Sequence, residues 1–161
     1  MKIKGIGIIV LFLLIFGPIL SQKNMKEHTH KDWEIALAGG VVPLLLENEV
    51  SFGLHFHVLR RIEKIKKVRI GLGFENVFDE HTHINSSFLF NYEIYKGLNA
   101  SVSPGILFLK EELFWHKKAS LHIELAYEFE IKNFHLGPVI EYSYSSIDQH
   151  LMFGLHLGIN F

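Results

Sequence analysis

The C-terminal segment HLMFGLHLGINF (150–161) alternates between two kinds of side chain. Its odd positions are all large and apolar, whereas its even positions are mostly histidine, glycine and asparagine. Period-two alternation predicts a β-strand with two unlike faces, because successive side chains of a strand point to opposite sides. The same pattern recurs in VSFGLHFHV (50–58) and SLHIELAYEFEI (120–131), and a helical repeat would scramble it.

Eight such segments follow one another, at residues 33–42, 49–59, 67–77, 84–95, 98–109, 119–131, 134–144 and 150–161. Their connections are short and polar, which suits hairpins between sequential antiparallel strands. We therefore predict an all-β fold, an eight-stranded antiparallel up-and-down barrel at residues 33–161, which leaves no sheet edge open. Pro104 and Pro138 fall inside two of the strands, where we expect bulges or rim positions because proline removes a ladder hydrogen bond.

Alternation alone leaves two opposite barrels open. In a transmembrane barrel the apolar face meets lipid and the polar face fills the interior. In a soluble lipocalin-like carrier the apolar face would line a ligand cavity, with Phe52, Phe56, Leu125 and Phe153 around it. Three features favour the membrane: lysines and arginines gather in the turns, glycine is frequent on the polar face, and aromatic residues lie near the strand ends.

Residues 1–21 have the build of a secretory signal peptide, in which Lys2 and Lys4 precede an apolar run from Gly5 to Leu20. We expect cleavage after this segment, which leaves a periplasmic N-terminal tail at residues 22–32. Loss of the two lysines changes 16 basic residues to 14, against 17 acidic ones, so the mature chain has no basic footprint for nucleic acid. The chain has no cysteine, which excludes a lipoprotein anchor and a disulfide framework.

Together these features resemble the small eight-stranded outer-membrane barrels of Gram-negative bacteria, particularly uncharacterised members of that class. The resemblance covers residues 33–161. Its most specific element is the final strand, which has apolar residues at alternate positions before a terminal aromatic: Leu155, Leu157, Ile159 and Phe161. The resemblance implies an outer-membrane location, contact with outer-membrane lipid, and recognition of these four residues by the barrel-assembly machinery.

The tetrapeptide EHTH occurs at residues 27–30 and again at 80–83. With both termini periplasmic, as in the barrels that the chain resembles, the first copy lies in the tail and the second in an outer loop. The second copy and neighbouring loop residues are candidates for a divalent metal site, because imidazole and carboxylate suit such ions. These candidates are Glu80, His81, His83, His116 and His150. The alternative is a solvated polar loop without an ion.

The polar face of the strands places many ionisable side chains inside the predicted barrel. The candidate interior network comprises His55, His57, Arg69, Glu75, Glu93, His122, Glu124, Glu128, Glu141 and His156. The same phase turns further residues inward, namely Glu34, Asn91, Glu130, His135 and Asn160. Because an isolated buried charge is costly, we expect pairing or hydration. The network is either a hydrogen-bonded plug that rigidifies the barrel or a group that responds to protons or cations.

The sequence gives no support for an enzyme. It contains no Walker motif, no HExxH and no GxGxxG before a helix, and Ser145 and Ser146, near Asp148 and His150, lack a nucleophile elbow. We expect a non-enzymatic barrel with a structural or surface-interaction role and no cofactor beyond a weakly bound divalent metal ion. A divalent-metal-binding or transport accessory barrel is one alternative, and a soluble lipocalin-like carrier is the other.

Overall fold

The computed structural model describes residues 32–161 apart from residues 48, 80–81 and 112–113. The predicted signal peptide, the first EHTH copy and all but the last residue of the predicted tail lie outside the described residues. Within the described part of the chain, no helix is long and apolar enough to cross a membrane. The regular structure there consists of β-strands.

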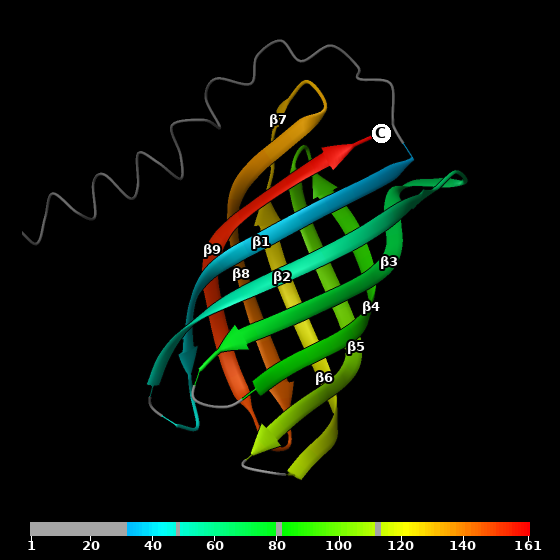
Figure 1. The fold of residues 1–161 in the computed structure, drawn as a ribbon. Coiled ribbons are helices and arrows are strands. Elements are labelled where there is room, and N and C mark those ends of the chain that lie inside the picture. Colours follow the sequence, from blue (N-terminus) through cyan, green and yellow to red (C-terminus); the bar gives the residue numbers. More distant parts are fainter. Residues whose placement is uncertain (1–31, 48, 80–81, 112–113) are drawn as a thin grey trace, which may run out of the picture. The chain divides into compact units, whose positions relative to one another are not determined.

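The described residues form nine strand segments (Figure 1): β1 (Trp33–Leu44), β2 (Glu49–Ile62), β3 (Ile65–Phe78), β4 (Thr82–Tyr95), β5 (Leu98–Glu111), β6 (Phe114–Tyr127), β7 (Phe129–Ile131), β8 (Phe134–Ser145) and β9 (Gln149–Asn160). β6 and β7 are two parts of one strand that is interrupted at Glu128, since both pair with β8. The sheet therefore has the eight strands that the alternation predicts. The largest difference in bounds is at β6, which begins at Phe114 instead of residue 119.

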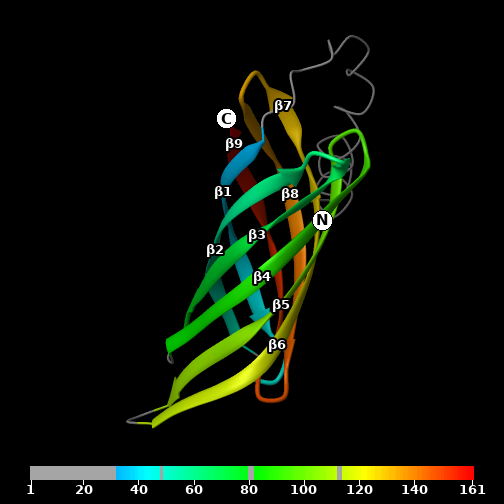
Figure 2. The same ribbon diagram turned by 90° about the vertical axis from the view of Figure 1, so that its right-hand side faces the viewer.

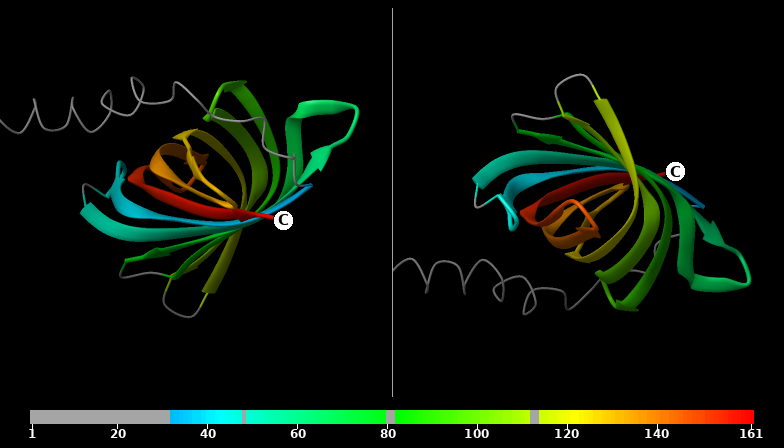
Figure 3. Two further views of the ribbon diagram at one scale, coloured as in Figure 1. Left: turned by 90° about the horizontal axis from the view of Figure 1, so that it is seen from above. Right: turned by 90° about the horizontal axis from the view of Figure 1, so that it is seen from below.

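The strands close into a barrel. Their order is β6-β5-β4-β3-β2-β1-β9-β8-β7, and a further pairing of β6 with β8 joins the two sides of the sheet. Where the first and last strands meet, Trp33 and Phe161 exchange two backbone hydrogen bonds of 3.1 and 2.9 Å. The views from the two ends show the strands curving around a common lumen (Figure 3). The predicted antiparallel up-and-down barrel is confirmed.

The two ends of the barrel differ. At the terminal end, Trp33 and Phe161 lie with the connections at 63–64, 96–97 and 132–133, and the connections at 45–48, 79–81, 112–113 and 146–148 join strands at the opposite end. By the strand bounds, all seven connections are two to four residues long. The hairpin of β5 and β6 extends beyond its neighbours at the opposite end (Figure 2), because the ladder between β6 and β8 begins only at Ser120.

Pro104 and Pro138 lie within strands, where one of the two flanking ladders is broken. The pairing of β4 with β5 skips Ser103 and Pro104, and the pairing of β8 with β6 and β7 skips Gly137 and Pro138. Proline has no backbone N–H to donate, so the ladder is interrupted on that side. The expected bulge or rim position is thus an interruption in mid-strand.

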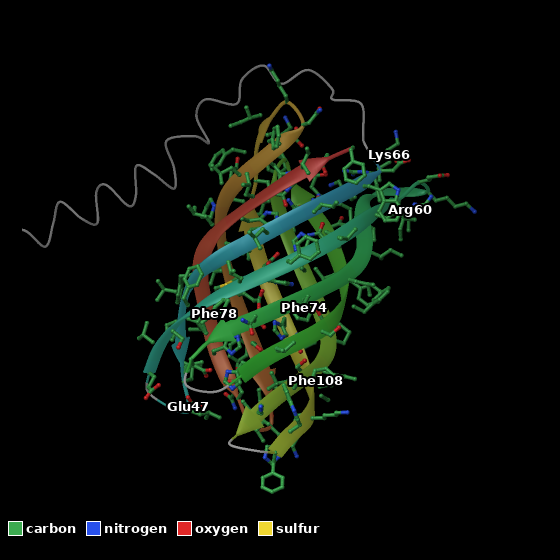
Figure 4. All side chains as sticks on the ribbon, viewed as in Figure 1. Glu47, Arg60, Lys66, Phe74, Phe78 and Phe108 are labelled. Carbon is green, nitrogen blue, oxygen red and sulfur yellow. The ribbon has the colours of Figure 1, made fainter. Side chains whose placement is uncertain are left out.

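The outer face of the barrel is apolar. Side chains such as Phe74 and Phe78 project away from β3 (Figure 4). The residues that a soluble carrier would place around a ligand cavity are instead 43–49% exposed on this outer face: Phe52, Phe56, Leu125 and Phe153. The lipocalin-like alternative is therefore wrong, because its cavity lining faces outward.

Exposed aromatic side chains mark both ends of the outer face. They are Trp33, Tyr95, Phe134 and Phe161 at the terminal end, and Phe78, Phe114, Trp115 and Tyr144 at the opposite end. Cations lie over two of the rings: the Arg60 guanidinium is 5.4 Å from the Trp33 ring centre, and Lys110 Nζ is 5.8 Å from that of Trp115. An apolar band between two aromatic girdles is typical of a barrel that crosses a bilayer.

Part of the lumen is filled by apolar side chains. Small and aliphatic residues from five strands pack together there: Ala38, Val42, Leu44, Val77, Ala126, Val139 and Met152. This packing leaves the rest of the lumen to polar and ionisable groups, which occupy the same inward phase of the strands.

Candidate metal centre in the barrel lumen

Ionisable side chains meet in the lumen and form one buried group, which we call the lumen column. Seven of the eight histidines that the structure describes belong to it, together with six carboxylates and Arg69. The strands position them because inward residues recur at every second position. The members are Glu34, His55, His57, Arg69, Glu75, His83, His122, Glu124, Glu128, His135, Glu141, Asp148, His150 and His156.

Glu141 joins two histidines in the middle of the column. One of its carboxylate oxygens lies 2.6 Å from His122 Nδ1 and the other lies 2.9 Å from His55 Nδ1. The second nitrogen of His122 is 2.8 Å from the Asn85 amide nitrogen and 3.2 Å from Ser143 Oγ. Hydrogen bonds therefore occupy both nitrogens of His122 and both oxygens of Glu141.

His150 continues the column toward the opposite end. Its Nδ1 is 2.8 Å from Asp148 Oδ2 and its Nε2 is 3.2 Å from Glu75 Oε1. Asp148 lies in the turn between β8 and β9. Its burial opposes ionisation, but the hydrogen bond from His150 outweighs that effect and holds the pKa of Asp148 below its ordinary value. Both ring nitrogens of His150 thus have carboxylate partners.

Arg69 organises the half of the column near the terminal end. It donates from Nε to Asn91 Oδ1 at 3.0 Å and from Nη2 to Asn99 Oδ1 at 2.9 Å. The guanidinium also pairs with Glu34 Oε2 and, at 3.5 Å, with Glu128 Oε2. Because Arg69 contacts the Oε2 atom of each glutamate, both Oε1 atoms remain directed at other groups.

The histidines beside these two glutamates are poorly hydrogen-bonded. His135 Nε2 is 3.6 Å from Glu34 Oε1, and His156 Nδ1 is 3.8 Å from Glu128 Oε1, which are too long for hydrogen bonds. Within the described residues, no hydrogen-bond partner reaches His135 Nε2 or either nitrogen of His156. These rings are 0% and 1% exposed, so the three nitrogens are buried polar atoms that require an explanation.

Three sets of buried side chains in the described chain place ligand atoms within 4.8 Å of one another. The terminal set comprises Glu34, Glu128, His135 and His156; the two others are His55, Glu124 and Glu141, and Glu75, Glu141 and His150. Imidazole nitrogen with carboxylate oxygen is a donor set for divalent first-row transition metals, whereas thiolate, the donor that Cu(I) prefers, is missing from this cysteine-free chain.

Glycine makes room for the imidazole rings. A Cβ on Gly158 would press against the His135 ring and lie 2.9 Å from Ala36 Cβ, and a Cβ on Gly73 would lie 2.8 Å from His55 Nε2. Gly158 is the direct cross-strand partner of His135. A narrow interior accommodates bulky residues only beside small ones, so these glycines are part of the site.

Most of the predicted interior network lies together in the lumen. Nine of its ten members are buried, and Glu93 is half-buried where the register of β4 and β5 shifts. Glu130, which we expected to face inward, is exposed beyond the interruption at Glu128. Asn85 and Asn99 were not predicted as members, although the same alternation puts both on the inward face.

The predicted outer-loop metal residues are distributed between two environments. β4 begins at Thr82, earlier than expected, and carries His83 into the lumen, where its Nδ1 is 3.0 Å from Asp79 Oδ2. His150 is also buried in the lumen, whereas His116 is exposed on the extended part of β6. Glu80 and His81 lie outside the described residues.

The residues considered for a nucleophilic triad have other partners. Ser145 Oγ donates to the Asp148 backbone oxygen at 3.1 Å and accepts from the Asp148 N–H at 2.9 Å. His150 contacts Asp148 and Glu75, not Ser145. Ser145 therefore closes the turn before β9, which is an ordinary role for a serine hydroxyl.

Comparisons with known proteins agree with this architecture. No family model matches the chain, and no curated protein matches it. Among solved structures, the Ail protein of Yersinia pestis superimposes with a TM-score of 0.57 at 14% identity, over 83% of this chain and 100% of that one. The barrel has the fold of the small transmembrane β-barrels.

Two further barrels give the same result. Neisserial surface protein A has a TM-score of 0.55 at 12% identity and covers 80% of this chain and 96% of its own. The N-terminal β-barrel domain of Pseudomonas aeruginosa OprF has a TM-score of 0.53 at 17% identity, with 83% and 100% covered. At these identities the likeness concerns the transmembrane barrel fold, and the role of this barrel must be argued from its own lumen.

Proposed function

We propose that this protein is a non-enzymatic outer-membrane barrel that binds a divalent transition-metal ion inside its lumen. The observation that carries the proposal is the composition of the lumen column. Six buried carboxylates face a single buried arginine, and seven histidines lie among them. A purely structural plug of charged groups needs a counter-charge for each carboxylate, whereas this lumen holds more carboxylates than arginines, together with metal-ligating imidazoles.

The charge balance of the column favours a bound cation. Among the described residues, Arg69 is the only buried lysine or arginine, so it offsets one of the six carboxylates. The remaining negative charge requires protons on the carboxylates or histidines, or a bound cation. A divalent ion offsets two charges at one point and can also bind His135 Nε2 and one nitrogen of His156, which have no hydrogen-bond partner among the described residues.

The short turns argue against a role carried by long surface loops. Each hairpin turn has two to four residues, so loops offer little area for a protein partner, which typically needs roughly 800 Å² per side. We therefore favour metal binding over the surface-interaction role that the sequence alone suggested. The structural role of the barrel is then to hold the ligands in a lipid-embedded frame.

Placement in the outer membrane is part of the proposal. It is supported by the apolar band, the two aromatic girdles and the signal-like residues 1–21. In the final strand, Leu155, Leu157 and Phe161 are 51–60% exposed on the outer face, next to β1. These side chains are accessible on the strand that closes the barrel, as recognition by the assembly machinery would require.

Equilibrium dialysis of the folded barrel in detergent against zinc, followed by elemental analysis, tests the proposal. His28, His30, His81 and His116 are replaced with alanine in the full mature chain, so that histidines not assigned to the lumen make no contribution. We expect at least one tightly held zinc ion per folded barrel and its release on unfolding. A folded barrel that retains no zinc would show that the lumen column is only a polar plug.

A further inference from the structure

We infer that the resident metal ion is held by the terminal set, Glu34, Glu128, His135 and His156, and that Arg69 is a positioning residue for its carboxylates. This inference rests on the proposed function and specifies which part of the lumen column binds the ion. The four ligands come from β1, the interruption between β6 and β7, β8 and β9. Their side chains are 0–7% exposed.

The distances within the terminal set fit an ion better than they fit hydrogen bonds. Two ligand atoms about 2.1 Å from a tetrahedral zinc ion lie about 3.4 Å from each other. The observed separations are 3.6 Å between His135 Nε2 and Glu34 Oε1 and 3.8 Å between His156 Nδ1 and Glu128 Oε1. Movements of a few tenths of an ångström would bring each of these two pairs to the spacing of zinc ligands, and all four ligand atoms lie within 4.8 Å of one another.

Three ring nitrogens of the terminal set are available, whereas His55 Nδ1 and both nitrogens of His150, in the two other sets, already contact carboxylates. His135 Nε2 and both nitrogens of His156 have no hydrogen-bond partner among the described residues. In the other sets, the carboxylates of Glu141 and Glu75 contact histidine nitrogens at 2.6–3.2 Å. Those two sets also share Glu141, so each would have to break existing hydrogen bonds to gather ligands.

Side chains outside the terminal set contact its ligands and orient them. Arg69 contacts the Oε2 atoms of Glu34 and Glu128, which leaves both Oε1 atoms facing the histidines. The Asn160 side-chain amide is 3.2 Å from His135 Nδ1. The amide atom at that distance is Nδ2, which donates to the ring nitrogen. Binding of an ion at Nε2 therefore requires a turn of the Asn160 amide by about 180°, after which Nδ1–H donates to Oδ1 and Nε2 keeps its lone pair. Such outer contacts fix the orientation and tautomer of metal ligands in proteins.

His57 contacts Glu34 Oε1, one of the atoms that would bind the ion. Its Nε2 lies 3.2 Å from Glu34 Oε1, and its ring is 5.1 Å from that of His156, centre to centre. A carboxylate oxygen has two lone pairs, so Glu34 Oε1 can accept from His57 and still bind an ion. The chemistry of two imidazoles and two carboxylates selects a divalent transition-metal ion, for which zinc is the probe.

Zinc titration calorimetry of the same tetra-alanine background tests the location of the site. His156→Gln and Glu128→Gln each remove one ligand, and we expect each to weaken zinc binding about 100-fold or more, beyond what loss of an outer contact typically costs. The matched control is His150→Gln, because His150 lies on the same strand, β9, and is as deeply buried as His156. It should bind zinc with unchanged affinity.

Each outcome has a definite meaning. Folding is verified by gel mobility of unboiled samples, and Glu128→Gln replaces His156→Gln if the latter does not fold. Weak binding by the terminal-set variants with normal binding by His150→Gln supports the inference. Normal binding by the terminal-set variants with weak binding by His150→Gln overturns it but leaves metal binding in place. A background protein that binds no zinc refutes both the site and the proposed function.

Discussion

Asp148 is the member of the lumen column that lies in a turn instead of a strand or a strand break. Its backbone N–H donates to Ser145 Oγ at 2.9 Å, and its carboxylate contacts His150 at 2.8 Å. These contacts link the turn at 146–148 to the interior of the barrel. The pKa of the carboxyl lies below the ordinary value of an aspartate because His150 stabilises its charged form against the cost of burial.

Asp148→Asn should therefore lower the stability of the folded barrel in a pH-dependent way. A carboxyl whose pKa is depressed by folding contributes stability above the pKa of the unfolded chain, near 4, and loses it as pH falls through the folded value. In urea unfolding from lipid vesicles, the gap between wild type and variant should be full at pH 7 and shrink steadily in acid below pH 4.

The matched control for this experiment is Glu47→Gln, which changes an exposed carboxylate in another turn at the same end of the barrel (Figure 4). It should shift the unfolding midpoint little at any pH. A gap for Asp148→Asn that is constant with pH, or that widens in acid, would contradict the role assigned to the His150 contact.

At the same scale, the sequence predicted which residues face the lumen but not which of them touch. His55 and Glu141 are both inward by alternation, yet they are 86 residues apart in the chain. Their contact depends on the tilt and stagger of the strands around the barrel, which period-two alternation does not specify. The available nitrogens of His135 and His156 could not be recognised for the same reason.

Among the strand elements, β6 has the most uneven environment. Residues from Ser120 to Ala126 lie between β5 and β8, whereas Phe114–Ala119 lie beyond the last pair with β8 and are exposed. The predicted strand begins at residue 119 because period-two alternation fades in FWHKKA (114–119), where both faces of the strand are exposed. The extension is therefore a property of the hairpin with β5 and not of the barrel wall.

Hydrogen–deuterium exchange on the detergent-solubilised barrel should divide β6 at Ser120. We expect slow exchange throughout Ser120–Ala126, because strands flank both sides, and measurably faster exchange in Phe114–Ala119. β9 provides the internal reference, since it is paired with β1 and β8 along most of its length. Equal protection of the two halves of β6 would contradict this division, because it would require Phe114–Ala119 to pair with a strand from outside this barrel.

The sequence predicts where the strands of the barrel lie and which side chains point to each face, because each strand is amphipathic and each connection is a short hairpin. The interruptions were harder to predict. Pro104 and Pro138 pointed to irregularities, but the break at Glu128 follows from the partner strand, where Gly137 and Pro138 skip their pairs. The residues of β6 themselves do not indicate the break at Glu128.

In the molecule as a whole, the proposed ion would act at the seam of the barrel. Its ligands come from β1 and β9, where the first and last strands meet, and from β8 and the break between β6 and β7. A metal ion bound there would cross-link the first and last strands of the barrel. Binding to the folded state alone stabilises it, by about 4 kcal/mol when zinc is at 1,000 times its Kd.

The most direct test of this account is an anomalous difference map at the zinc edge, from crystals of the folded barrel grown with zinc. The account predicts a peak in the lumen, about 2.1 Å from His135 Nε2 and from a ring nitrogen of His156, with Glu34 and Glu128 oxygens completing the shell. A lumen without an anomalous peak, with zinc only on surface histidines such as His116, would contradict it.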